Sequence, residues 1–471
     1  MWSVFSWEVV SIGSAIAIFS VAACSPTELV FPEVDHPDSA YGRLVHRQHY
    51  PPSRLGPVTS GPARPHVPAG TRLKGGGILL AWESEMHVAV ATPAFPMPRS
   101  GRNAGIERLA KGMVDGFIAH DLEVTVVTTF WNGGPALERY GRARVNRITD
   151  TTTTIGRLGA LGDSHYWTWG FRVGRVLKET VRPDVVHCLT PLASAPSLTR
   201  ANLPIVTTFH HPDRIWRLQD LLYIPFHRIL ESRGYHASTL LITPSRASAR
   251  AVERMFGVAG ERIRVVYWGV NPERFKPRIR SDSGETKILY VGHHERRKGI
   301  VYLLEAVALL HREGIPVRLT TVGGGKQLPE LKERTRKLGI GDFVTFLGYV
   351  PDPHDEKLPA LYSQADVFVF PSLMEGFGFV LIEAMASGIP VVASDVSAIP
   401  EVVGDAGVLV PAGNAGALAT AIRTLAEDPR RRSDLARRGM DRVANLFTWD
   451  KVIPKLISTY EEAIHLARGQ S

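Results

Sequence analysis

Residues 371–386 read PSLMEGFGFVLIEAMA and carry the strongest structural signal in the chain. The apolar run Val367–Phe370 before them has the length and composition of a buried strand. Gly376 and Gly378 follow in a turn, where glycine permits a close backbone approach, and a helix is predicted over Gly376–Ser387. Free backbone amides at the start of a helix suit a phosphate group. The stretch therefore predicts a strand–turn–helix unit that binds an anion.

Two glutamates, Glu375 and Glu383, stand eight positions apart in this unit. At about 3.6 residues per turn, Glu375 is expected at the mouth of the helix and Glu383 about two turns deeper. Carboxylates accept hydrogen bonds from neighbouring hydroxyls, so the pair can hold a sugar and a ribose. Glu383 lies among apolar residues, where an unpaired charge is costly. This favours a binding role over a solvated surface position.

Short apolar runs alternate with longer amphipathic stretches from Met86 onward, which is typical of strand–helix–strand units. In the first half, strands are expected at His87–Ala91, Val124–Thr128, Val185–His187, Pro204–Thr208 and Leu240–Thr243. In the second half, they are expected at Ile288–Val291, Val317–Val322, Val344–Leu347, Val367–Phe370 and Val391–Ala393. Further helices are expected at Ile106–His120, Val301–Arg312, Leu328–Leu338 and Ala415–Glu427.

The two series of strands predict two domains, since 471 residues exceed one ordinary hydrophobic core. Pro, Arg, Ser and Gly interrupt the rhythm over Asn271–Thr286, which is the expected interdomain linker. The predicted fold class is α/β, with Rossmann-like domains over residues 86–275 and 285–448 that face each other. Residues 449–471 are expected to form a final helix. Doubly wound sheets bind ligands at the carboxyl ends of their strands, so a cleft between the domains is the expected site.

Residues 1–85 are expected to be an N-terminal extension or linker, largely disordered. The apolar stretch Val9–Cys24 is shorter than the roughly 20 residues that a membrane-spanning helix needs. The first Lys or Arg is Arg43, so the positive segment of a signal peptide is missing. Pro51–Gly77 is rich in Pro, Gly and Arg, as linkers are. A signal, an anchor and an extension translated upstream of Met86 all stay open.

Composition excludes several classes of protein. Hydrophobic residues at 44% and charged residues at 21% are typical of a globular protein, neither disordered nor integral to a membrane. The net charge of +9 fits phosphates, anionic substrates or peripheral contact with an anionic membrane. Basic runs interleaved with aromatics are missing, so no nucleic-acid partner is expected. The only cysteines, Cys24 and Cys188, build no disulfide framework, which favours a reducing, cytoplasmic location, including the inner membrane face.

The motif around Glu375 resembles the E-x7-E motif of the family 4 retaining glycosyltransferases, which have the GT-B fold. The resemblance extends over about Met86–Leu466. It implies transfer of a hexosyl group from a UDP- or GDP-sugar to a hydroxyl of a lipid, a glycan or a small molecule. It further implies that Glu375 contacts hydroxyls of the donor sugar and Glu383 the ribose. The other donor-binding residues expected in this motif are Gly376, Phe377, Gly378 and Leu381.

Residues 290–299 resemble the strand and loop that hold the donor diphosphate in this family. Fixed cations stabilise the negative charge of a leaving diphosphate. Lys298 matches the family lysine and is expected to act in catalysis. His293 replaces the arginine that usually follows the first glycine, and a histidine is only partly charged near neutral pH. Arg296 or Arg297 is the expected substitute.

Two further segments resemble parts of the donor site. Residues 348–350 resemble the loop beneath the nucleobase, which makes Tyr349 and Val350 candidates for donor binding. Residues 103–108 resemble the Gly-Gly loop that opens the first helix, with Ala104 in place of the first glycine. Gly105 is then expected to approach the donor phosphate, and a simple helix-capping turn is the competing interpretation.

The segment Thr208–His211 follows a predicted strand and resembles the active-site histidine segment of the family. His210 is the matching residue, expected near the outer hydroxyl of the sugar and near the acceptor, and His211 is a weaker candidate. An Asp-x-Asp signature is missing from the chain, so transfer without a metal or other cofactor is predicted. Residues 447–450 precede a helix that crosses back to the first domain in this fold.

By the same resemblance, the reaction keeps the anomeric configuration without an assigned enzyme nucleophile. Two alternatives share the fold: a nucleotide-sugar epimerase, and a nucleotide-sugar-binding scaffold with weakened turnover, which His293 and Ala104 keep open. A phosphorylase would need pyridoxal phosphate, and no lysine marks that role. Residues 323–326 read GGGK, without the spacing of a P-loop, and a dinucleotide-binding Gly-x-Gly-x-x-Gly is also missing.

Overall fold

The computed structural model describes residues 86–93, 95, 105–129, 135–148, 165–191, 203–210, 220–277, 284–350 and 356–469. The chain divides into two units, residues 1–78 and 79–471, and all the described residues belong to the second. The predictions for residues 1–85, for Ala104 and for His211 lie outside the described residues.

The first sheet has eight strands in the order β3-β4-β2-β1-β5-β6-β7-β8. Its neighbours are parallel except for the antiparallel pair of β3 and β4. The strands are β1 (His87–Ala91), β2 (Glu123–Thr129), β3 (Leu137–Tyr140), β4 (Ala143–Ile148), β5 (Val185–Cys188), β6 (Ile205–Thr208), β7 (Leu240–Thr243) and β8 (Ile263–Val265).

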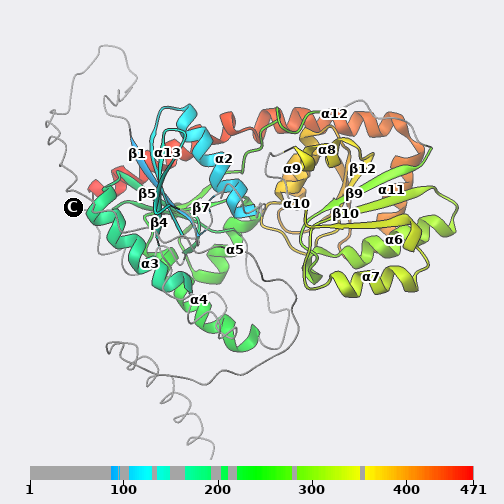
Figure 1. The fold of residues 1–471 in the computed structure, drawn as a ribbon, viewed down its shortest axis with the longest axis horizontal. Coiled ribbons are helices and arrows are strands. Elements are labelled where there is room, and N and C mark those ends of the chain that lie inside the picture. The colour runs from blue at the N-terminus through cyan, green and yellow to red at the C-terminus, as the bar shows by residue number, and fades with distance from the viewer. Residues whose placement is uncertain are drawn as a thin grey trace, which may run out of the picture. The chain divides into compact units, whose positions relative to one another are not determined.

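Helices cover both faces of this sheet, as the alternation along β1 requires. Val88 and Val90 belong to the core that α2 shares, whereas Ala89 and Ala91 join a second core with Trp169 of α3. Figure 1 shows α2 and α13 on one side of the sheet and α3 and α4 on the other. The helices are α2 (Gly105–Ala119), α3 (His165–Val176), α4 (Asp220–Ala237) and α5 (Arg246–Phe256).

The second sheet has six strands in the order β11-β10-β9-β12-β13-β14, all parallel. The chain moves outward from β9 on one side and resumes with β12 on its other side. The loops after β9 and β12 therefore flank the crevice at which such sheets bind ligands. The strands are β9 (Thr286–Val291), β10 (Val317–Val322), β11 (Val344–Gly348), β12 (Val367–Phe370), β13 (Val391–Ser394) and β14 (Gly407–Val410).

Two groups of helices cover the second sheet. α6, α7 and α11 pack together on one face, and α9, α10 and α12 on the other (Figure 1). The helices are α6 (Ile300–Arg312), α7 (Leu328–Lys337), α8 (Lys357–Ser363), α9 (Phe379–Ala386), α10 (Ile399–Val403), α11 (Ala415–Glu427) and α12 (Pro429–Leu446).

The last helix, α13 (Trp449–Gly469), returns to the first sheet, where it packs against α2, β5 and β6 (Figure 1). A parallel bridge between Val270 and Thr448 marks the point of return. Close approach of α13 to α2 depends on two glycines. A Cβ at Gly112 would lie 2.2 Å from the Trp449 ring, and one at Gly116 would lie 2.5 Å from the Ile453 side chain.

The expected α/β architecture of two doubly wound sheets is confirmed, with differences at the ends of elements. The helix expected over Gly376–Ser387 begins only at Phe379, because Gly378 has φ +93° and interrupts the backbone there. Glu375 consequently lies in the loop before the helix rather than at its mouth. Strands β3, β4, β8 and β14 were not predicted. In β3, β4 and β8 charged residues interrupt the apolar run, and β14 is a short strand at the edge of the second sheet.

Across the residues that the structure describes, no helix is long and apolar enough to span a bilayer.

Candidate active site

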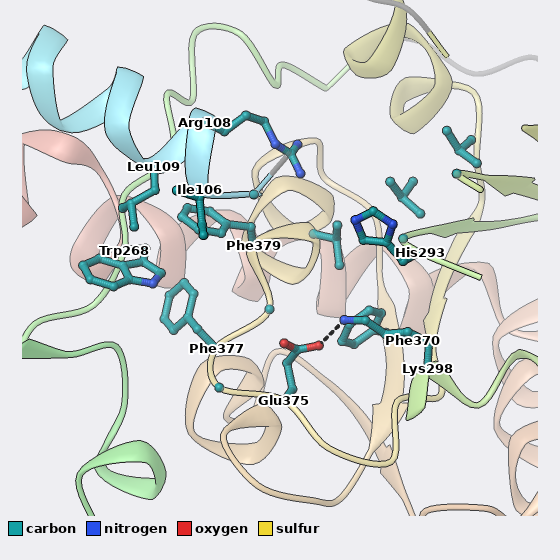
Figure 2. A pocket seen from close by; sticks show the side chains of 18 of the residues that line it. Ile106, Arg108, Leu109, Trp268, His293, Lys298, Phe370, Glu375, Phe377 and Phe379 are labelled. Atoms are coloured by element: carbon teal, nitrogen blue, oxygen red, sulfur yellow. Dashed lines mark hydrogen bonds and ion pairs between the residues drawn. The ribbon is translucent and has the colours of Figure 1, made fainter. Parts of the chain in front are cut away.

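A cleft of about 890 Å³ opens between the carboxyl ends of the two sheets. The first sheet contributes residues of α2 together with His210 and Trp268, and the second contributes the loops after β9, β10 and β12. Figure 2 shows side chains from both sets pointing into this space. Of the predicted site residues, the cleft brings together Gly105, His210, His293, Arg297, Lys298, Tyr349, Val350, Glu375, Gly376, Phe377 and Gly378.

The Glu375 loop, residues 371–378, connects β12 to α9 and forms one wall of the cleft. Its last residue, Gly378, adopts φ +93°, and a Cβ there would lie 2.9 Å from Leu381 Cδ1. Only glycine adopts such a backbone readily. The loop thereby directs its backbone toward the cleft just before the N-terminus of α9, as an anion-binding turn requires.

Glu375 and Lys298 form an ion pair in the cleft, with Lys298 Nζ 2.5 Å from Glu375 Oε2. Figure 2 shows the two side chains pointing toward each other, with Phe370 beside the lysine. Lys298 Nζ lies 5.1 Å from the centre of the Phe370 ring. Burial lowers the pKa of Lys298, and the Glu375 carboxylate opposes that effect. The two loops at the crevice of the second sheet thus present a carboxylate and a nearly buried cation together.

Arg297 and His293 add positive or titratable groups to the same wall. Arg297 Nη1 lies 3.9 Å from Glu375 Oε2, and its Nε donates to Glu295 Oε2 at 3.2 Å. His293 is exposed and lines the cleft, and Figure 2 places it on the same side as Lys298. Arg296 instead lies 3.8 Å from Glu330 and does not line the cleft. Of the two predicted substitutes for the missing arginine, Arg297 is therefore the one that the fold places at the site.

The glycines 323–325, which follow β10, also line the cleft, although they were not predicted as site residues. A Cβ at Gly323 would lie 2.0 Å from the Gly292 carbonyl oxygen, and one at Gly325 would lie 2.4 Å from that of His294. These contacts allow the β10 loop to pack directly on the loop that carries His293. Three consecutive glycines directly after a predicted strand are the sequence signal for this part of the site, although they lack the spacing of a P-loop.

Glu383 lies behind the cleft wall and is not part of the lining. Its side chain is 4% exposed. Arg108 Nη1 of α2 lies 2.5 Å from Glu383 Oε1, and the Tyr362 hydroxyl donates to Oε2 at 2.9 Å. Burial raises the pKa of Tyr362, and Glu383 raises it further, so the hydroxyl keeps its proton. Burial works to lower the pKa of Arg108, but the Glu383 carboxylate outweighs it and raises the value.

Arg108 was not predicted as a site residue, yet it lines the cleft and reaches from α2 across to the second domain (Figure 2). It belongs to the first turn of the helix that Gly105 opens. Gly105 also lines the cleft, and a Cβ there would meet nothing within 4 Å. The helix start therefore approaches the cleft without a steric requirement for that glycine.

His210 follows β6 and lines the cleft near Trp268, with ring centres 6.2 Å apart. Its Nε2 lies 2.7 Å from the Leu189 carbonyl oxygen. A carbonyl only accepts, so Nε2 carries a proton and donates. This bond fixes the orientation of the ring at the carboxyl edge of the first sheet.

Tyr349 and Val350 follow β11 and line the cleft, and Tyr349 is 44% exposed. An exposed aromatic side chain offers a face for stacking. Leu381, by contrast, is fully buried and packs in the core of the second domain. Within the described parts of the chain, no group of three or more His, Cys, Asp or Glu side chains is placed to hold a metal ion. Transfer without a metal stays a prediction.

Two family models match the chain. The model for glycosyl transferases group 1 matches residues 271–442, and the model for glycosyltransferase family 4 matches residues 103–274. The first covers the second sheet with the Glu375 loop, and the second covers most of the first domain. The two matches overlap at residues 271–274 and together span both walls of the cleft.

Known proteins resemble the chain over nearly their whole length. An MMP alpha-(1->4)-mannosyltransferase from Mycolicibacterium hassiacum is 30% identical over 422 residues, which is 80% of this chain and 98% of that protein. A sucrose-phosphate synthase from Thermosynechococcus elongatus has a similar structure, with a TM-score of 0.68, 22% identity and coverage of 80% and 99% of the two chains. The HepE protein of Anabaena, solved with UDP-glucose, gives a TM-score of 0.61, 20% identity and coverage of 80% and 100%.

Proposed function

Because the chain belongs to the family 4 glycosyltransferases with the GT-B fold, we propose that it transfers a hexosyl group from a UDP- or GDP-sugar to a hydroxyl of a glycan, with retention. The ion pair of Lys298 and Glu375 at the cleft carries this proposal, since it combines a sugar-binding carboxylate with a cation for the diphosphate. A mannosyltransferase relative that forms an alpha-(1->4) linkage supports a sugar acceptor. The HepE structure with UDP-glucose is compatible with a nucleotide-sugar donor. Lipids and small molecules remain alternative acceptors.

In the proposed reaction, the bond between the anomeric carbon and the diphosphate oxygen breaks, and a bond to the acceptor oxygen forms on the same face. The proton of the acceptor hydroxyl passes to the leaving phosphate. Lys298 and Arg297 stabilise the charge that accumulates on the diphosphate, together with amides of the Glu375 loop. Glu375 accepts hydrogen bonds from sugar hydroxyls, and His210 orients the outer part of the sugar and the acceptor. Glu383 lies behind the cleft wall, so it holds the ribose only when Arg108 releases its Oε1.

The test is release of nucleoside diphosphate from UDP-glucose and GDP-mannose, with and without glycan acceptors. Glu375→Ala and Lys298→Ala are each expected to lower kcat about 100-fold or more while the fold survives, because each removes charge placed at the reacting centre. Glu333 and Lys337 on α7 offer a matched control. Lys337 Nζ lies 3.6 Å from Glu333 Oε1, but both side chains are more than 40% exposed. Glu333→Ala and Lys337→Ala are expected to keep normal rates.

A folded Glu375→Ala protein with near-normal turnover would remove the central assignment. If the wild-type chain binds a nucleotide but neither transfers nor hydrolyses any donor, the weakened scaffold is the better account. The exposed His293 at the position of the family arginine is the observation that favours this alternative. In that case His293→Arg is the first variant to assay for restored turnover.

A further inference from the structure

The first turn of α5 meets the Glu375 loop, although the two belong to different domains. Ser245 caps the helix, accepting from the Ser248 amide at 3.0 Å. Both serines are buried, with 0% and 2% of their surface exposed. Neither serine is among the site residues that the family resemblance implies.

The Gly376 carbonyl receives two hydrogen bonds from this helix end. The Ser245 hydroxyl donates to it at 2.9 Å and the Ser248 hydroxyl at 3.1 Å. A carbonyl oxygen has two lone pairs, and both are thereby used. A buried carbonyl left without donors is costly. The conformation of the loop at Gly376 thus depends on hydroxyls that the first domain supplies.

The same helix end also holds Glu401. The Arg246 amide donates to both carboxylate oxygens of Glu401, at 3.0 and 2.9 Å, and the Tyr267 hydroxyl donates at 3.0 Å. A carboxylate at a helix N-terminus is favoured by the helix dipole and the free amides. Glu401 belongs to α10, so this contact fixes α10 against the first domain.

α10 in turn contacts the loop next to Gly376. The amide of Ala398, the residue that caps α10, donates to the Glu375 carbonyl at 3.3 Å. Two successive carbonyls, those of Glu375 and Gly376, are therefore held by different elements. α10 holds the first within the second domain, and α5 holds the second from the first domain.

We propose that Ser245 and Ser248 are positioning residues for Glu375. Their hydroxyls fix the backbone that follows Glu375, so its carboxylate takes its working orientation only while α5 is in contact with the loop. Approach of the two domains is then coupled directly to the geometry of the sugar-binding group. This inference rests on the proposed role of Glu375 in donor binding.

The test uses the full chain with Ser248→Ala, with the double variant Ser245→Ala/Ser248→Ala, and with Ser248→Thr, which keeps the hydroxyl. Ser433→Ala is the control, because it removes an exposed hydroxyl that donates within α12. Three experiments are performed: steady-state kinetics give kcat and KM for nucleotide release from the donor that the wild type consumes, a titration gives the affinity for the free nucleotide, and hydrogen exchange is followed over residues 371–381.

The double variant is expected to lower kcat at least tenfold, to bind the free nucleotide within twofold of wild type, and to exchange faster over residues 371–381. Ser248→Ala leaves the cap at Ser245 in place and is expected to show an intermediate loss. Ser248→Thr is expected to recover most of the rate, and Ser433→Ala to match wild type. Loss of kcat with little change in nucleotide affinity separates positioning from a general structural defect.

Wild-type kcat and wild-type exchange in the double variant would overturn the inference. If that variant unfolds, Ser248→Ala decides the matter by the same two measurements. Full turnover of Glu375→Ala would instead refute the proposed function. Exchange over residues 371–381 would still report whether α5 orders the loop, so the two failures are distinguishable.

Discussion

Glu383 shows how a single residue depends on both domains. It accepts a hydrogen bond on each carboxylate oxygen, from Arg108 of the first domain and from Tyr362 of the second. Removing one partner of a buried ion pair leaves an uncompensated charge, which costs about 3–5 kcal/mol. The pair therefore restrains Glu383 in one orientation.

A double-mutant cycle measures this restraint. Arg108→Leu is expected to lower the free energy of unfolding more than Arg108→Leu/Glu383→Gln, because the second change removes the stranded charge. The coupling between the two positions is expected at about 1–3 kcal/mol. Urea denaturation followed by tryptophan fluorescence gives the four values, and a coupling below about 0.5 kcal/mol would show that the contact contributes little.

His187 is a second buried polar residue with a measurable signature. Its Nδ1 lies 2.6 Å from the Tyr460 hydroxyl and its Nε2 lies 2.8 Å from Thr208 Oγ1. Burial lowers the pKa of His187 from about 6.5 to about 3, and the charge of His210 adds to the effect. The ring thus stays neutral while it connects α13 to β5 and β6.

This pKa predicts a pH dependence of stability. Between about pH 6.5 and pH 3 the unfolded chain binds a proton at His187 that the folded chain does not, so stability falls as the pH falls. The slope from this group reaches about 1.4 kcal/mol per pH unit. His187→Gln is expected to make the decline shallower, whereas His465→Gln, at an exposed position of α13, leaves it unchanged. Equal slopes for all three proteins in pH-dependent urea denaturation would contradict the assignment.

Among the elements, the crossing of α2 and α13 is a contact that is sensitive to side-chain volume. The Trp449 ring lies against Gly112 and Gly269, where a Cβ would come within 2.2 and 2.4 Å of it. One aromatic side chain thus packs on two backbones of the first domain, at the point where the chain returns from the second. This contact sets how closely α13 approaches the first sheet.

Gly112→Ala is expected to destabilise the protein by about 1–3 kcal/mol, because the added methyl group overpacks the crossing. Helix propensity alone favours alanine over glycine by about 1 kcal/mol, so it predicts the opposite sign. Gly416→Ala on α11 is the matched control, since its nearest neighbour is 3.5 Å away. Thermal melts decide between the two effects, and equal gains in Tm at both positions would mean that α13 does not pack as described.

A helix or strand could be predicted from the sequence where neighbouring residues alone determine it. Buried parallel strands such as β1, β9 and β12 each contain an apolar run, and the sequence alone was sufficient to locate them. The start of α9 was misplaced because the backbone of Gly378 is left-handed, and the periodicity of the sequence does not reveal a backbone angle. The switch point between β9 and β12 explains why Lys298 and Glu375 meet.

Contacts between residues that are far apart in the chain could not be predicted from the sequence. Arg108 and Glu383 are 275 positions apart, and nothing in either segment indicates the other. The same holds for Ser245 and Gly376, 131 positions apart. Resemblance to the family identified Glu375, Lys298 and Glu383 as candidates, but it gave no information on the residues of the first domain that hold them.

For the molecule as a whole, the cleft is a composite in which each domain completes the other. The second domain supplies the ion pair of Lys298 and Glu375, and the first supplies His210 and Trp268. Two contacts between the domains involve the predicted donor-binding residues: Arg108 pairs with Glu383, and α5 binds the Glu375 loop. The geometry for transfer is therefore a property of the two domains together, and nucleotide affinity is expected to rest mainly on the second.

Calorimetric titration of the full chain with UDP, GDP and ADP tests the central claim most directly. One nucleotide is expected to bind clearly more tightly than the others. Glu383→Ala and Lys298→Ala are each expected to weaken its binding at least tenfold, since one loses a ribose contact and the other a diphosphate contact. Binding of no nucleotide, or unchanged affinity in both variants, would contradict the account of the cleft as a nucleotide-sugar site.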